Sequence, residues 1–233
     1  MTRGASPVAS TAAVEELHAL LKADLAGTTP LRSQPIRPVH WTVARLASSV
    51  TADAGEVPFQ HASARSVGVR AVERFRAEIG AFAEADNGAG GGRDRDALTG
   101  YLIANVRRLV RGSYSEQVGR ALFSAIAEAM LLLAWMTFDD APKTVLTQKY
   151  FSYARQFAHR AGNRLLEAAV LAAMSHQACC AGVSYEAVEL AAAARQGTVD
   201  SDPPCIRFFD VTQPVSWKPM LKTVCGYSSR GAA

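Results

Sequence analysis

The chain has 233 residues, of which 49% are hydrophobic and 20% charged, so it can bury a full core and lacks the composition of a disordered protein. Four cysteines without a CxxC pair exclude a disulfide framework and a zinc ribbon. A net charge of +4 permits contact with nucleic acid without requiring it. Glu15 and Glu16 precede any apolar run, which argues against a secretory signal, and we expect a cytoplasmic protein.

The first predicted elements are two amphipathic helices joined by a proline-rich connector. Apolar residues three and four positions apart predict one helix over residues 11–25 and another over 66–85. Prolines at positions 30, 35, 38 and 58 interrupt the stretch between them. Residues 1–65 are therefore predicted to form a loosely attached N-terminal segment.

A run of further helices is predicted up to residue 196. The next helix covers 98–110 and is expected to close at Gly112 in a left-handed conformation. A capping box from Ser113 to Glu116 then opens a long helix through Phe138. Three more helices are predicted over 146–161, from 165 to the break at Gly182, and over 184–195. No strand-like alternation occurs in this region, so the predicted fold is all-α over residues 66–196, followed by an irregular tail over 197–233.

One stretch, 121–138, is almost apolar enough to be tested as a membrane span. Glu128 lies inside it, and an acidic side chain near the middle of a bilayer is costly. A helix packed inside an all-helical protein is the better interpretation, with Glu128 turned to a polar neighbour or an edge. No membrane association is therefore expected.

The helices show a weak internal repeat. Trp135 and His176 are 41 positions apart, and three further pairs are each 40 apart: Gln148 with Val188, Phe151 with Ala191, and Ala154 with Ala194. Small residues at matching positions, Ala134 with Ser175 and Ala154 with Ala194, suit close crossings of paired helices. This pattern predicts antiparallel helix pairs stacked as a short tetratricopeptide-like array. An ordinary antiparallel bundle remains the alternative.

The residues of these helices also resemble a known family. The stretches 113–128, 133–139, 148–151 and 170–178, read as SYSEQVGRALFSAIAE, LAWMTFD, QKYF and VLAAMSHQA, look like the C-terminal, tetratricopeptide-like region of actinobacterial XRE-type helix-turn-helix transcriptional regulators. The likeness covers about 67–195, and residues 13–69 are more loosely similar to the connector between the two domains of those regulators. The resemblance implies a regulatory role for the chain.

Two features depart from the family pattern. Members begin with a helix-turn-helix domain, and the nearest candidate here, residues 42–51, lacks the turn glycine and lies among prolines. The helical array of the family also continues beyond the point at which this chain becomes rich in proline, after Gly197. We expect a truncated or degenerate member, with a tail that arises from an out-of-frame extension.

Helix phase and the resemblance together predict a concave groove that senses a partner or a ligand. Trp135, Thr137, His176 and Cys179 are its candidate lining residues. The expected partner is a protein or a peptide, with a small effector as a further option, and a homodimer stays open. DNA contact is expected to be indirect or weak.

Direct DNA binding is the competing function. Arg107, Arg108 and Arg111 lie close together at the end of one predicted helix and form the candidate nucleic-acid contact, together with the degenerate helix-turn-helix candidate at residues 42–51. Cations are favoured near a helix C-terminus in any case, so a solvated face is a better interpretation of the arginines than a phosphate-binding patch.

His176, Cys179 and Cys180 lie at i, i+3 and i+4, a spacing at which an imidazole and thiols share one helix face and can bind a soft metal or act as a redox pair. Cysteine is more often a small apolar filler, and three ligands need a fourth. We therefore expect no metal site and no cofactor. Because no catalytic motif is present, we also expect no enzyme activity.

Overall fold

The computed structural model describes residues 7–36, 66–89, 94–140 and 144–196, and the structural statements below concern these residues. They form seven α-helices and one short 3-10 helix: α1 (Pro7–Leu25), η1 (Pro30–Arg32), α3 (Val69–Ala89), α4 (Arg95–Val110), α5 (Glu116–Asp140), α6 (Val145–Arg160), α7 (Arg164–Cys180) and α8 (Ser184–Gln196). This part of the chain contains no β-strand, which confirms the predicted all-α fold. The connector over 37–65, with its candidate at 42–51, and the tail over 197–233 lie outside the described residues.

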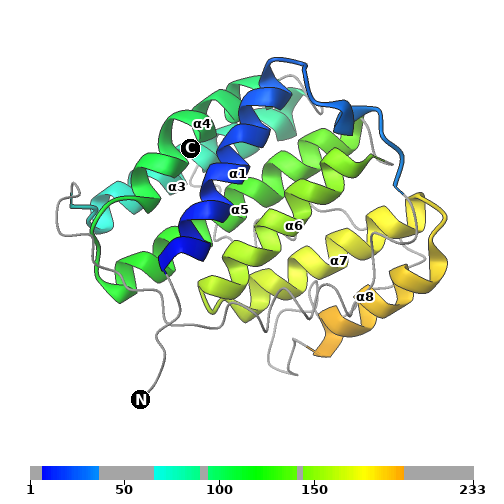
Figure 1. The fold of residues 1–233 in the computed structure, drawn as a ribbon. Helices are drawn as coiled ribbons and strands as arrows, with labels where there is room; N and C mark the ends of the chain where they lie inside the picture. The colour runs from blue at the N-terminus through cyan, green and yellow to red at the C-terminus, as the bar shows by residue number, and fades with distance from the viewer. Residues whose placement is uncertain (1–6, 37–65, 90–93, 141–143, 197–233) are drawn as a thin grey trace, which may run out of the picture.

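The helices from α5 to α8 lie side by side in chain order, and α3 and α4 cover the other side of α5 (Figure 1). Helix α5 therefore lies in the interior, where it packs against α3, α4, α6 and α7. The small residues of the predicted crossings, Ala134 with Ser175 and Ala154 with Ala194, are all buried. Both a helical array and an antiparallel bundle pack consecutive helices in this way. The tetratricopeptide-like repeat therefore stays a prediction.

The prediction of a loosely attached N-terminal segment is wrong for α1. Val14, Leu17 and Leu21 are at most 2% exposed and belong to the same hydrophobic core as the later helices. They lie on one face of α1, which packs against α4. An apolar stripe of this kind is stable only when it is covered, so the boundary predicted at residue 65 does not separate α1 from the domain.

The helix ends show which turn predictions hold. Gly162 and Gly182 adopt φ of +66° and +78°, the left-handed conformation that ends a helix and that glycine tolerates best. Gly112 does not, because α4 ends through a right-handed C-cap at Arg111. The N-terminus of α5 is capped two residues later than predicted, where the Ser115 hydroxyl accepts the backbone N–H of Val118 at 3.3 Å.

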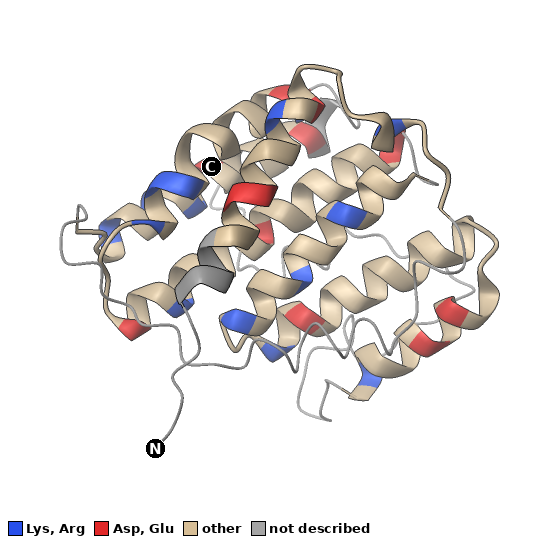
Figure 2. Ribbon diagram, viewed as in Figure 1, with Lys and Arg blue, Asp and Glu red and all other residues tan. Residues whose placement is uncertain are grey.

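Helix α5 is the one described helix long and apolar enough to cross a membrane, but 89% of its most apolar window is buried inside the protein. Charged residues lie mainly on the other helices and at helix ends, as Figure 2 shows. Glu128 is 3% exposed, and both of its carboxylate oxygens accept hydrogen bonds from Arg76 of α3, at 2.9 and 3.0 Å. The acidic residue is thus turned to a polar neighbour, as predicted for a core helix.

A second buried charge joins the N-terminal segment to the body of the fold. The Asp24 side chain, at the end of α1, is fully buried and accepts hydrogen bonds from Arg95 of α4, from the Tyr150 hydroxyl of α6 at 2.6 Å and from Arg32 of η1 at 3.0 Å. Arg95 also donates to Thr137 of α5 at 3.0 Å. We call these five residues the Asp24 junction. It connects five elements of the fold at one point.

Replacing Asp24 by asparagine should destabilise the protein strongly. The variant keeps the shape of the side chain but leaves the buried guanidinium of Arg95 without its main counter-charge, a change that costs about 3 kcal/mol or more. Arg32→Gln is the matched control, because Arg32 is 44% exposed and its ion pair is worth about 1 kcal/mol or less. Urea unfolding measures both. A loss for Asp24→Asn no larger than that for Arg32→Gln would show that the junction does not stabilise the fold.

The buried Glu128 predicts a pH dependence of stability. Burial raises the pKa of Glu128 above its ordinary value of 4.5, and the hydrogen bonds and charge of Arg76 offset only part of this effect. Between pH 4.5 and the raised pKa of the folded state, Glu128 is protonated more in the folded chain than in the unfolded chain. The folded state therefore has the full stabilisation from protonated Glu128 below about pH 4.5 and loses it as the pH rises. Glu128→Gln removes the titration. The free energy of unfolding of the variant minus that of the wild type should therefore increase from about pH 4 to pH 7. Urea titrations at both pH values measure this difference. A difference that stays constant or decreases would contradict the prediction.

Candidate functional site

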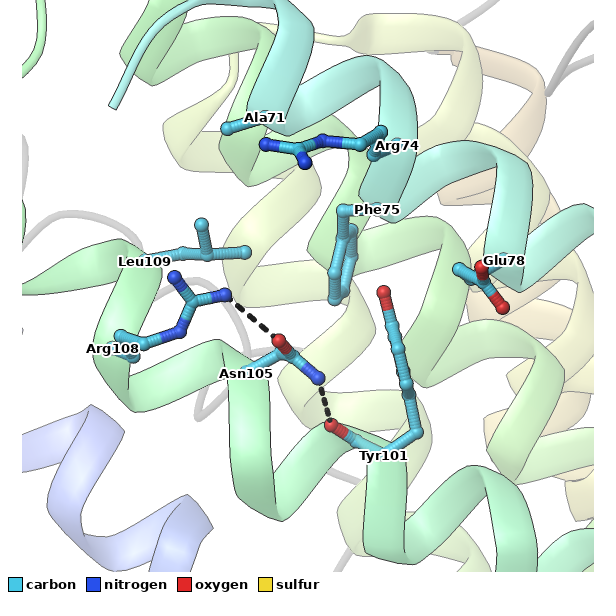
Figure 3. A pocket seen from close by; sticks show the side chains of 8 residues that line it. All are labelled: Ala71, Arg74, Phe75, Glu78, Tyr101, Asn105, Arg108 and Leu109. Atoms are coloured by element: carbon cyan, nitrogen blue, oxygen red, sulfur yellow. Dashed lines mark hydrogen bonds between the residues drawn. The ribbon is translucent and has the colours of Figure 1, made fainter. Parts of the chain in front are cut away.

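A cleft lies on the surface between α3 and α4. Its volume is about 430 Å³, which falls within the range of small-molecule sites. Eight residues line it: Ala71, Arg74, Phe75 and Glu78 from α3, and Tyr101, Asn105, Arg108 and Leu109 from α4 (Figure 3). We call this site the α3–α4 cleft. It combines charged, amide, phenolic and apolar groups on two rigid helices.

The aromatic wall of the cleft is built from both helices. The rings of Phe75 and Tyr101 are stacked with their centroids 5.6 Å apart, and Phe82 lies against the same tyrosine at 5.8 Å. Phe75 is 2% exposed, so the wall is anchored in the core. Aromatic contacts of this kind fix the ring positions, and the half-buried Tyr101 ring is the part of the wall that an apolar ligand group can reach.

Arg108 is held at the cleft by a short chain of hydrogen bonds along α4. Its Nη2 atom donates to Asn105 Oδ1 at 2.9 Å, and Asn105 Nδ2 donates to the backbone carbonyl of Tyr101 at 2.9 Å (Figure 3). Arg74 extends its guanidinium over the same side of Phe75 from α3. The cleft therefore carries two cations on one side of its aromatic wall.

The acidic and phenolic groups lie on the opposite side of Phe75 (Figure 3). Burial raises the pKa of the Tyr101 hydroxyl, and the Glu78 carboxylate raises it further. The phenol therefore stays neutral near physiological pH and can donate a hydrogen bond. A carboxylate near it can accept a hydrogen bond from a ligand or pair with a cation.

This arrangement is suited to binding. Guanidinium groups recognise carboxylates and phosphates through charge-assisted hydrogen bonds, and the rings can cover an apolar portion of the same molecule. The lining residues include no serine, threonine, cysteine or histidine to act as a nucleophile or as an imidazole base.

The structure does not place the predicted groove residues on one open surface. Trp135 is 1% exposed and Thr137 is 2% exposed, with Thr137 bonded to Arg95 in the Asp24 junction. His176 is half-buried, and Cys179 is exposed. The prediction of a groove is therefore wrong for Trp135 and Thr137, because α5 is covered on both sides and has no face left for solvent over residues 122–137.

Two of the three predicted nucleic-acid contacts are paired with an acidic residue of α1. Glu15 Oε1 accepts hydrogen bonds from Arg107 Nε at 2.9 Å and from Arg111 Nη2 at 2.5 Å. The same arginines hold the pKa of Glu15 below its ordinary value, with the hydrogen bond from Arg107 as the largest favourable cause. Arg108 instead faces the α3–α4 cleft. The three arginines therefore do not form one free cationic patch.

Of the His176, Cys179 and Cys180 set, the structure brings two members together. Cys180 Sγ lies 3.8 Å from His176 Nε2, while no group of three histidine, cysteine or acidic side chains in the described part of the chain is arranged around one metal position. Burial lowers the pKa of His176. The imidazole also contacts the rings of Trp135 and Phe138, with centroids 5.9 and 5.4 Å away.

Most of the cleft cannot be predicted from the sequence. Helical periodicity places Arg74 on a solvated face, and it places Phe75 and Tyr101 on the apolar faces of two separate helices. Their meeting depends on how α3 and α4 lie on α5, which helical periodicity does not specify. The one usable signal was the arginine at 108, whose neighbour Asn105 lies one helical turn earlier.

Comparison of the chain with protein-family models, with curated proteins and with solved structures found no match.

The ion pairs of Glu15 with Arg107 and Arg111 should weaken the binding of these arginines to DNA. Glu15→Gln should free Arg107 and Arg111, so the affinity for random duplex DNA at low salt should increase several-fold and fall more steeply as salt is added. Glu116→Gln is the matched control, because it removes one carboxylate from the exposed pair with Arg120 and changes the net charge equally. Fluorescence anisotropy across a salt series measures the affinities. Equal increases for the two variants would show that only net charge matters.

Proposed function

We propose that the chain is a non-catalytic sensing module of a transcription regulator, which binds an anionic effector in the α3–α4 cleft. The observation that carries the proposal is the composition of that cleft, in which Arg74 and Arg108 lie beside an aromatic wall formed by Phe75 and Tyr101. A ligand with a carboxylate or phosphate and a flat apolar portion suits this chemistry.

The position of the cleft supports a sensing role. Helix α4 contributes one side of the cleft, and the same helix carries Arg95 in the Asp24 junction and Arg107 in the pair with Glu15. A ligand that shifts α4 relative to α3 would therefore act on the contacts of α1. In the regulators that the sequence resembles, the segment equivalent to residues 13–69 connects the sensing region to the DNA-binding domain. Ligand occupancy would pass along this route to a protein partner in the cytoplasm.

Direct DNA binding is less well supported. Glu15 neutralises part of the charge of Arg107 and Arg111, and the third arginine lines the cleft. The candidate reading segment at residues 42–51 lies outside the described residues. A sequence-specific gel shift at about physiological salt that is lost in Arg108→Gln would favour DNA binding over effector binding.

The test is a ligand screen with matched variants. Purified full-length chain is screened by thermal shift against aromatic carboxylates, aliphatic carboxylates and phosphate monoesters, and hits are titrated by calorimetry. We expect a hit that binds the wild type and that Arg74→Gln or Arg108→Gln weakens about tenfold or more, since each variant removes a charge-assisted hydrogen bond. Arg120→Gln, in an exposed pair on α5, should bind like the wild type.

Two results would contradict the proposal. The first is a screen without any hit among these anions. The second is a hit whose affinity is the same in Arg74→Gln, Arg108→Gln and Arg120→Gln, because such a ligand would bind outside the cleft. Circular dichroism of each variant confirms that the helices are intact.

A further inference from the structure

The last turn of α7 brings together two side chains that are good ligands for soft metal ions. Cys180 Sγ and His176 Nε2 are 3.8 Å apart, one helical turn from each other. In the metal-free protein this contact is a weak hydrogen bond between thiol and imidazole. Both side chains are half-buried, so they remain accessible to a small ion.

The distance between the two atoms suits a shared ion. Typical bonds from a metal to a thiolate sulfur and to an imidazole nitrogen are about 2.3 and 2.0 Å. One ion between the two atoms therefore spans up to about 4.3 Å when the bonds are collinear and less when they bend. The observed separation of 3.8 Å is about 0.5 Å shorter than this collinear span, so the two side chains have to move apart by about that distance to hold an ion in a linear geometry.

The surroundings restrict the kind of ion. The aromatic rings of Trp135 and Phe138 flank His176 and offer no ligand atom. No third histidine, cysteine or carboxylate of the described residues completes a metal-binding group. Zinc prefers four ligands, whereas monovalent copper is soft, favours thiolate sulfur and accepts two donors. The missing fourth ligand argues against a zinc site, and this objection does not apply to a two-donor ion.

The electrostatics favour a cation at this position. Helix α7 ends at Cys180, and the C-terminal end of a helix carries partial negative charge. This field opposes a bare thiolate but is compatible with a thiolate whose charge is balanced by a monovalent cation. A neutral imidazole coordinates a metal ion through a ring nitrogen, and Nε2 is the ring nitrogen of His176 that faces Cys180 Sγ.

We propose that Cys180 and His176 form a two-donor binding site for copper(I). Binding replaces the thiol proton of Cys180, which is released to solvent, while the neutral imidazole donates its lone pair through Nε2. No electron is transferred in this step, because the ion enters and stays in the monovalent state. The site is separate from the α3–α4 cleft and does not depend on the proposed effector.

The adjacent thiol supplies a matched control. Cys179 is exposed and lies on the same helix, whereas the contact with His176 Nε2 is made by Cys180. Purified full-length chain, reduced and kept anaerobic, competes for copper(I) with the chromogenic chelator bicinchoninate. We expect Cys180→Ser and His176→Gln each to weaken copper(I) binding at least tenfold, and Cys179→Ser to leave it within about twofold, since only the first two variants remove a donor.

A second measurement reports on the site without any substitution. Copper(I) should slow alkylation of Cys180 by N-ethylmaleimide and leave Cys179 reactive, as peptide mass spectrometry can show residue by residue. Equal losses of affinity in Cys179→Ser and Cys180→Ser would instead indicate a vicinal dithiol and overturn the proposal. Binding that is unchanged in His176→Gln, or equal protection of both thiols, would overturn it as well.

Discussion

The fold depends on a buried ion pair between Asp24 and Arg95. Both side chains are at most 3% exposed, and a charge so far from water is tolerated only when it is paired and its remaining hydrogen bonds are satisfied. Tyr150, Thr137 and Arg32 provide those bonds. The pair joins α1 to α4, and its full set of hydrogen bonds forms only when α5 and α6 also lie beside it. It therefore specifies one arrangement of helices whose apolar faces alone would accept several.

Helix α5 provides the second constraint. Helices cover it on opposite sides. Glu128, the acidic residue in its middle, accepts hydrogen bonds from Arg76 on α3. These bonds hold α3 close to the core helix, and α4 packs on α5 beside it. The α3–α4 cleft lies where these two helices meet at the surface. Its aromatic wall is continuous with the core through Phe75, while its charged rim remains in solvent. A preformed site of this kind binds a ligand without a large ordering cost.

The positions of the two proposed sites follow from the same architecture. The cleft uses the outer faces of α3 and α4, and the copper(I) site uses the end of α7, where the chain turns at Gly182. Neither involves the side chains at the centre of α5, because those are consumed by the core. The groove predicted around Trp135 and Thr137 was wrong for this reason: an apolar residue on a helix with two covered faces contributes to packing and not to recognition.

The sequence by itself determined the all-α class, most helix bodies, the breaks at Gly162 and Gly182 and the burial of residues 121–138. These features are local, since they follow from apolar spacing within one helix and from the conformational freedom of glycine. Only the tertiary structure decided that α1 joins the core, that Glu15 pairs with Arg107 and Arg111, and that Arg74 meets Arg108 across a cleft. Such contacts join residues far apart in the chain: Glu15 and Arg111 are 96 positions apart, and Asp24 and Tyr150 are 126 apart. Helical periodicity gives the face on which a side chain lies, whereas the crossing of two helices decides what that face meets.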